Sequence, residues 1–345
     1  MAKYPTRKIG TDDVSAIGFG AMGIGAYYGQ TGPDEERFKV LDKAYELGCT
    51  FWDTANIYGD SEELIGKWYR RLKLNPEKRD NIFLATKFGI VVSGSDGRGV
   101  DGSPQNVHES FAKSQKLLGV DKVELYYLHR PDPDTPIEET VGAMAELVKQ
   151  GKVKYLGLSE CTADTLRRAQ KVHPIAAVQV EYSPFTLDIE DSKLNILNTA
   201  RELGIKIIAY SPLGRGLVTG QYKSPDDFES NDFRRMVPRY SKENFPNILK
   251  LADDIKRVGE QYNATAGQVA LAWLLAQGED VIPIPGTKKI KYLEENLGAI
   301  NASLSPESVQ EVRMIAEKAD WVVGDRYPPA AMKALYAETP LPKST

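Results

Sequence analysis

Residues 122–129 read KVELYYLH, a short run of apolar, β-branched and aromatic residues that ends in a histidine. Similar runs recur along the whole chain: SAIGFG (15–20), TFWD (50–53), NIFLATKF (81–88), KYLGLS (154–159), AAVQVEYS (176–183), IKIIAYS (205–211) and DVIPIPG (280–286). Each run has the length and composition of a buried strand. The sequence therefore predicts eight strands.

Segments with helical periodicity lie between these runs. Ile137, Val141 and Met144 fall on one face of a helix, and Phe38 and Leu41 do the same earlier in the chain. Alternating strands and helices indicate a parallel sheet, and eight strands favour a closed barrel over an open, doubly wound sheet. We therefore predict an α/β fold, a single (β/α)8 TIM barrel domain over residues 1–345.

The connections of the predicted barrel differ in length. RKIGTDD, followed by VSAIGFG, predicts a hairpin that covers the N-terminal end of the barrel. Three long stretches are expected to be irregular: 89–104, 212–246 and the tail from about Trp321 to Thr345. The first two follow strand ends where barrel enzymes place their active-site loops.

Composition excludes several classes of function. The chain has 44 Lys and Arg against 48 Asp and Glu, a net charge of −4, which argues against a nucleic-acid or membrane-surface partner. No apolar run is long enough to span a bilayer, and the N-terminus lacks a secretory signal. Two cysteines and three histidines are scattered without ligand spacing, so we expect a reduced, cytoplasmic protein without a metal site.

Three predicted strands end in an ionisable residue: Asp53, Lys87 and His129. Alone, each has a simple structural explanation, as a turn cap, a solvent-exposed lysine or a hydrogen-bonded histidine. In one barrel, however, all three would project at the same rim, where barrel enzymes carry out their chemistry. We therefore expect these residues to form one site.

The residues around these positions resemble a known family. DTANIYG (53–59), ATK (85–87) and YLH (127–129) resemble the catalytic tetrad of the aldo-keto reductases in order and spacing. The resemblance continues through GLSE (157–160), VQVEYSP (178–184), AYSPLGRGLVTG (209–220) and IPGTKKIKYLEEN (284–296). It implies a (β/α)8 barrel that reduces aldehydes or ketones to alcohols with NADPH, with Asp53, Tyr58, Lys87 and His129 as catalytic residues.

The chemistry explains why these four residue types belong together. Carbonyl reduction by hydride transfer needs an acid that protonates the developing alkoxide. Tyr58 would be this acid, and we expect the Lys87 ammonium to lower the pKa of its phenol from about 10. Asp53 would keep Lys87 charged and oriented. His129 would donate to the carbonyl oxygen or share the proton with Tyr58.

The resemblance also implies the residues that bind NADPH. Ser159 and Gln179 would hold the nicotinamide carboxamide, and Tyr210 would stack on the ring. The other implied contacts are Ser211, Leu213, Gly214 and Gly216 with the pyrophosphate, Gly286, Thr287 and Lys288 with the 2′-phosphate, and Glu295 and Asn296 with the adenine. A phosphate suits the last group, which combines backbone donors, a helix start and cations.

Three features of this region depart from simple patterns. Glu160 stands where the family has Asn, and an ionised carboxylate cannot donate a hydrogen bond. Tyr292 aligns where the family often has Arg, which leaves the strictness of the NADPH preference open. Arg234 and Arg235 in the long loop are further candidates to clamp phosphates.

One sequence feature imitates a different cofactor site. Gly18-Phe-Gly20-Ala-Met-Gly23 formally matches the dinucleotide fingerprint. No helix is expected to open at its third glycine, since more glycines and Pro33 follow. We interpret it as a flexible first loop near the nicotinamide.

Two other functions remain possible from the residues. Lys87 could form a Schiff base in a barrel aldolase. Alternatively, the chain could be an NADP-binding regulatory partner similar to channel β-subunits. For a reductase, Tyr27, Tyr28 and Phe88 suggest aromatic or apolar aldehydes as substrates. The sequence indicates neither the physiological substrate nor the oligomeric state.

Overall fold

The computed structural model describes residues 4–71, 77–93, 97–318 and 324–343. Eight parallel strands form one sheet in the order β12-β11-β10-β9-β8-β5-β4-β3. Their bounds are β3 Phe19–Gly20, β4 Phe51–Asp53, β5 Phe83–Phe88, β8 Val123–Leu128, β9 Val153–Ser159, β10 Ile175–Glu181, β11 Lys206–Tyr210 and β12 Val281–Pro283. Every predicted run coincides with one of them, although β9 and β10 each begin one residue earlier than predicted, so the eight strand predictions are confirmed.

The two edges of this sheet meet and close the barrel. The backbone N–H of Gly18 donates to Pro283 O at 2.9 Å, and that of Gly20 donates to Pro285 O at 3.1 Å. A Cβ at Gly20 would lie 2.6 Å from Ile284 O, so only glycine fits here. The predicted (β/α)8 barrel is therefore confirmed, and the second glycine of the apparent fingerprint serves strand closure.

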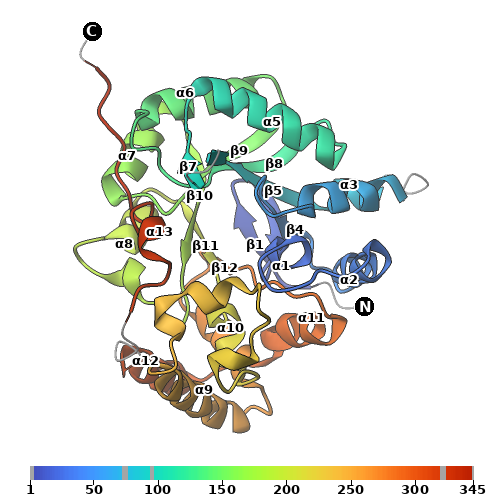
Figure 1. Ribbon diagram of the computed structural model, residues 1–345, viewed down its shortest axis with the longest axis vertical. Coiled ribbons are helices and arrows are strands. Elements are labelled where there is room, and N and C mark those ends of the chain that lie inside the picture. The colour runs from blue at the N-terminus through green and yellow to red at the C-terminus, as the bar shows by residue number, and fades with distance from the viewer. Residues whose placement is uncertain (1–3, 72–76, 94–96, 319–323, 344–345) are drawn as a thin grey trace.

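Helices surround the barrel (Figure 1). As predicted, Phe38 and Leu41 of α2 and Ile137, Val141 and Met144 of α6 are buried. The helices are α1 Met22–Gly25, α2 Asp34–Glu46, α3 Ser61–Arg71, α4 Glu77–Asp80, α5 Pro104–Leu118, α6 Ile137–Lys149, α7 Ala163–Val172, α8 Ile196–Glu202, α9 Phe245–Glu260, α10 Ala266–Ala276, α11 Ile290–Leu297, α12 Pro306–Lys318 and α13 Pro329–Met332. The one-turn helix α1 replaces the open loop expected after Gly20.

The N-terminal hairpin covers one end of the barrel, as expected. It pairs β1 (Thr6–Ile9) with β2 (Asp12–Ser15) in antiparallel register. Ile9 and Val14 pack against barrel residues near the starts of the strands, including Phe51 and Leu125. Arg7 ties the hairpin to the other side of the barrel, where Nη1 donates to Gly278 O at 2.8 Å. The opposite end, where the strands finish, is left for the candidate site.

The stretch 89–104 is not irregular, contrary to expectation. It contains an antiparallel hairpin of β6 (Ile90–Ser93) and β7 (Gly97–Val100). The β-branched residues Ile90, Val91 and Val92 favour this extended pairing. The stretch 212–246 has the predicted loop character. It contains short 3₁₀ helices: η3 Gly214–Thr219, η4 Pro225–Asp227, η5 Phe233–Met236 and η6 Pro238–Tyr240.

The described part of the tail docks on the barrel. Ala337 forms a β-bridge with Cys161, and Arg168 of α7 donates to Thr339 O at 2.9 Å. The start of the predicted tail, residues 321–323, lies outside the described residues. None of the described helices is long and apolar enough to cross a membrane.

Candidate active site

Asp53 and Lys87 lie side by side at the ends of β4 and β5. Lys87 Nζ forms an ion pair with Asp53 Oδ1 and donates to Thr54 O at 2.8 Å. From β10, Gln179 Nε2 donates to Asp53 Oδ2 at 2.8 Å. Both charged side chains are almost fully buried, at 2% and 0% exposure. The parallel sheet thus joins residues from three strands in one network.

Tyr58 and His129 lie next to this pair. Their rings meet edge to face, with centroids 5.7 Å apart. Lys87 Nζ lies 5.0 Å from the centroid of the Tyr58 ring. The structure therefore brings together all four residues that the sequence predicted as catalytic.

The direction of the pKa shift at Tyr58 differs from the expectation. Burial, together with the Asp53 carboxylate, raises the pKa of Tyr58 well above its ordinary value, while Arg130 acts in the opposite direction. The predicted lowering by Lys87 is not seen, because desolvation of the phenolate outweighs it and Asp53 balances the ammonium. Burial also lowers the pKa of Lys87, opposed by its attraction to Asp53. Tyr58 consequently keeps its proton at neutral pH.

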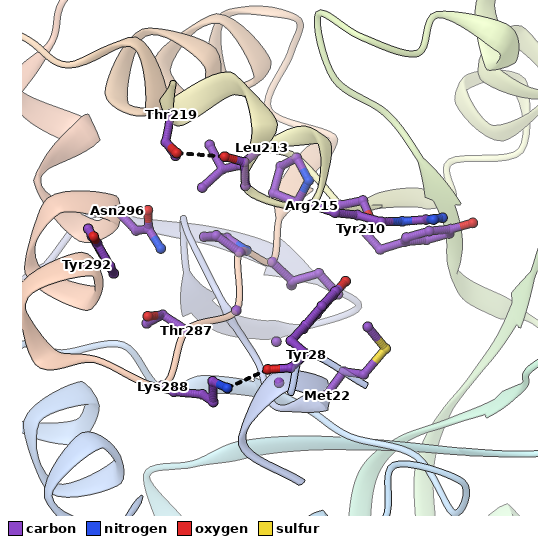
Figure 2. Close-up of a pocket in the computed structure, with 18 of the residues that line it drawn as sticks. Met22, Tyr28, Tyr210, Leu213, Arg215, Thr219, Thr287, Lys288, Tyr292 and Asn296 are labelled. Carbon is purple, nitrogen blue, oxygen red and sulfur yellow. Dashed lines mark hydrogen bonds between the residues drawn. The ribbon is translucent and has the colours of Figure 1, made fainter. Parts of the chain in front are cut away.

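A cavity of about 440 Å³ opens beside Tyr58 (Figure 2). Its wall includes Asp53, Tyr58 and ten of the predicted cofactor residues: Gln179, Tyr210, Ser211, Leu213, Gly216, Gly286, Thr287, Lys288, Glu295 and Asn296. Four predicted residues lie outside the wall: Lys87, His129, Ser159 and Gly214. The cavity therefore connects the end of β4 with the start of α11.

The loop after β11 wraps one side of the cavity. Ser211 and Arg215 both have left-handed backbone conformations, with φ of 49° and 57°. Arg215, which sequence reasoning missed, lines the cavity and pairs with Glu181 at 3.4 Å. The chain offered no signal for it beyond its place within AYSPLGRG.

Of the two other arginines proposed from this loop, only Arg234 lines the cavity. Its guanidinium pairs with Asp232 at 2.6 Å and also donates to Arg215 O at 2.9 Å. Arg235 donates to Phe228 O at 2.8 Å and is absent from the cavity wall. Arg234 thus stabilises the backbone of this loop at Arg215.

Lys288 bridges two loops across the cavity. Its Nζ donates to Tyr28 O, a bond shown in Figure 2, and to Gln30 O at 2.8 Å. Thr287 Oγ1 accepts from the Lys289 N–H at 3.1 Å at the start of α11. Lys289 and Tyr292 complete this part of the wall. The positive charge at this end suits an anionic group such as a phosphate.

The chain was compared with known proteins. Residues 16–317 match the family model described as Aldo/keto reductase family. This protein belongs to the aldo/keto reductase family. It is 61% identical to the aldo-keto reductase str7 of Strobilurus tenacellus, over 97% of this chain and 98% of that protein. It is 49% identical to "Aldo-keto reductase yakc [NADP(+)]" of Schizosaccharomyces pombe, over 98% and 99%.

Structural comparison gives the same family. A glycerol dehydrogenase of Gluconobacter oxydans superimposes with a TM-score of 0.79 at 27% identity, covering 93% of this chain and 97% of that one. The barrel predicted from the strand count is therefore the fold of this aldo/keto reductase.

Glu160 has a structural place in this family member. It is fully buried, accepts from the Glu181 N–H at 3.1 Å and pairs with Arg326 at 3.4 Å. Its carboxylate is thus directed into a buried cluster outside the cavity wall. Arg326 comes from the tail and also pairs with Glu181 at 2.9 Å and Asp188 at 3.1 Å.

Sequence reasoning missed both Arg326 and Arg130. Arg130 directly follows His129 and is buried. The available signal was chemical: acidic residues at the ends of predicted buried strands, such as Glu160 and Glu181, need cations, and an arginine immediately after a catalytic strand stands near the chemistry. Among the described residues, no group of His, Cys, Asp and Glu could hold a metal ion.

Proposed function

We propose that this protein reduces aldehydes or ketones to alcohols with NADPH, using Tyr58 as the general acid. The observation that carries the proposal is the assembly of Asp53, Tyr58, Lys87 and His129 at one end of the barrel, beside a cavity that runs to Lys288. Such assembly of an acid, a cation and their orienting groups is the geometry that proton donation requires.

The cavity fits the proposed cofactor. Glycines in the wall, such as Gly216 and Gly286, allow backbone N–H groups to approach phosphates, and Lys288 and Lys289 supply positive charge. Because Gln179 Nε2 is committed to Asp53, its carbonyl oxygen remains to accept from the carboxamide. Ser159, Tyr210, Ser211, Leu213, Gly214, Thr287, Glu295 and Asn296 are the other proposed cofactor contacts. When bound, NADPH supplies the hydride.

The residues of the chain manage the proton. Burial keeps Tyr58 protonated, so the phenol is ready to donate to the carbonyl oxygen. The phenolate left behind is stabilised by the nearby charges of Lys87 and Arg130. Asp53 holds Lys87 in place, and His129 orients the carbonyl beside Tyr58. A positioned acid of this kind contributes about 10²–10⁴ in rate.

Aromatic rings next to Tyr58 support apolar or aromatic substrates. The Tyr27 ring contacts Tyr58 and Phe233 edge to face, at centroid distances of 6.3 and 6.4 Å. Tyr327 stands 5.9 Å from Phe233. Phe88, expected in this wall, is fully buried instead and stacks on Tyr126, because its strand turns it towards the helices. We therefore expect the substrate body to pack against Tyr27, Phe233 and Tyr327, which lie next to Tyr58 and outside the cavity wall.

The test is the loss of NADPH absorbance with benzaldehyde, alongside the Tyr58→Phe variant, which keeps the ring. We expect NADPH-dependent turnover that falls by at least about 10²-fold in the variant, with NADPH affinity unchanged. NADPH binding without turnover in the native protein would favour the regulatory-subunit alternative. Absence of binding would refute the cofactor assignment, and borohydride trapping of substrate on Lys87 would indicate the aldolase.

A further inference from the structure

Arg130 differs from the other buried arginines of the described chain. Arg7, Arg37, Arg215, Arg234 and Arg326 each pair with at least one carboxylate. Arg130 is 8% exposed, and among the described residues no carboxylate forms an ion pair with it. Its hydrogen bonds to described residues both come from Nη1, to His129 O at 2.8 Å and Ser159 Oγ at 3.2 Å. A buried cation without an anion is costly.

The unused donors of Arg130 lie next to the proposed active site, although Arg130 is not part of the cavity wall. Nε and Nη2 make no hydrogen bond to a described residue. They are also not among the described polar atoms that are buried without a partner, so both nitrogens are accessible to solvent or to a ligand. The guanidinium carbon lies 5.9 Å from the Tyr327 ring, and Tyr327 reaches Tyr210 in the cavity wall with its hydroxyl at 3.3 Å. The charge of Arg130 also acts on Tyr58. The open donors are thus close to the proposed acid.

We propose that Arg130 is a specificity-determining residue that binds a carboxylate of the substrate. The preferred substrates are then aldehydes or ketones with an apolar or aromatic body and a carboxylate near the reacting carbonyl. Two N–H groups on adjacent nitrogens of a guanidinium match the two oxygens of a carboxylate. This inference rests on the proposed function, since Tyr58 fixes where the reacting carbonyl lies.

The local charge balance supports an anion over a neutral acceptor. Lys87 and Asp53 neutralise each other, and the Arg215 and Arg326 guanidinia face Glu181. The Glu160 carboxylate acts on Arg130 from a distance, but it is itself paired with Arg326. Arg130 therefore keeps a positive charge near Tyr58 that no carboxylate of the described residues contacts directly. A substrate carboxylate would neutralise it and would replace the water that otherwise solvates Nε and Nη2.

The experiment compares kcat/KM for 2-, 3- and 4-carboxybenzaldehyde with that for their methyl esters and for benzaldehyde. We expect the native protein to prefer at least one acid over its ester. In Arg130→Met the ratio of kcat/KM for the acid to that for its ester should fall by about 10–100-fold, the usual worth of a hydrogen-bonded charge. Weaker stabilisation of the Tyr58 phenolate would slow the acid, the ester and benzaldehyde alike, so it cancels in this ratio. Arg130→Lys, which keeps the charge without the two-pronged geometry, should be intermediate.

Arg79→Met is the matched control. Arg79 is also partly buried and contacts Glu124 of β8 at 3.4 Å, but it lies at the opposite end of that strand from Arg130. This variant should keep the acid-to-ester ratio. If the acid-to-ester ratio fell in Arg79→Met as well, the ratio would report general damage to the protein, and the assignment of Arg130 would be overturned.

Two further outcomes would overturn the proposal. One is a native protein that favours no acid over its ester. The other is an Arg130→Met variant that loses acids, esters and benzaldehyde equally with a raised KM for NADPH, which would make Arg130 a positioning residue for Ser159. If the native protein fails to turn over benzaldehyde at all, the proposed function fails instead. Calorimetric binding of benzoate, weaker in Arg130→Met, then still tests Arg130.

Discussion

Two groups of paired charges lie at the same end of the barrel, and they are built in different ways. The Asp53–Lys87 pair comes from neighbouring strands and contacts Tyr58. The tail cluster, defined as Glu160, Glu181, Asp188, Arg215 and Arg326, joins strand ends to a loop and to the tail, across up to 166 positions of sequence. In the proposed function the first group serves proton transfer, and we expect the second group to hold the tail and the loop after β11 in place.

The largest effect should follow from breaking the first group. Lys87→Met leaves the Asp53 carboxylate buried and unpaired and removes a charge that stabilises the Tyr58 phenolate. We expect kcat to fall by about 10²–10⁴-fold and the free energy of unfolding to fall by about 3–5 kcal/mol. Turnover assays and urea unfolding measure the two effects.

The double variant Asp53→Leu with Lys87→Met separates them. With both charges gone, stability should largely recover, because a buried ion pair can be replaced by apolar groups at little cost. Activity should stay low. If the double variant recovered activity along with stability, the pair would have no part in the proton transfer.

The tail cluster should respond in stability more than in chemistry. Arg326→Met leaves Glu160 and Glu181 without their shared cation, and we expect a loss of about 3–5 kcal/mol in unfolding free energy. Because Arg215 Nη1 donates to Arg326 O, which remains, kcat should change far less than in Lys87→Met. Urea unfolding beside benzaldehyde turnover distinguishes the two groups. A kcat loss as large as that of Lys87→Met would contradict the division.

The same contrast explains what could be predicted from the sequence. Asp53, Lys87 and His129 end strands, and parallel strands finish at one rim, so their meeting follows from the fold. Arg326 reaches Glu160 only through the docking of the tail, and no local pattern encodes that contact. The burial that raises the pKa of Tyr58 is likewise a property of the packed site and not of the residues near it in the chain.

Loops were predicted less well than strands, for a related reason. The hairpin β6–β7 lay within a stretch expected to be irregular, because the glycine- and serine-rich sequence SGSDGRG (93–99) obscured the short β-branched run beside it. The η3 turn was predicted as a phosphate-binding loop, but its left-handed Arg215 was not, since non-glycine residues rarely adopt that conformation.

A smaller effect, on the binding of NADPH, is expected from a change at Lys288. Lys288 Nζ donates to two carbonyl oxygens and, like Arg130, forms no ion pair among the described residues, so its charge remains to bind an anionic ligand. We expect Lys288→Met to raise the KM for NADPH by about tenfold, the worth of one charged hydrogen bond, and to leave the KM for NADH nearly unchanged. Lys291→Met, on the exposed side of α11 outside the cavity wall, is the control. Equal losses for both cofactors would remove the 2′-phosphate assignment.

The smallest effect is a pH dependence of stability in the tail cluster. Burial would raise the pKa of Glu181, but Arg326 and Arg215 outweigh it and hold this pKa below the ordinary value of 4.5. A carboxyl whose pKa is lower in the folded state stabilises the fold at neutral pH, and that contribution is lost as pH falls below about 4.5. Urea unfolding between pH 7 and pH 4 should therefore show a smaller decline for Glu181→Gln than for the native protein. Glu317→Gln on the exposed face of α12 should keep the native decline, and equal slopes in all three proteins would show that the cluster holds the tail by packing and not by charge.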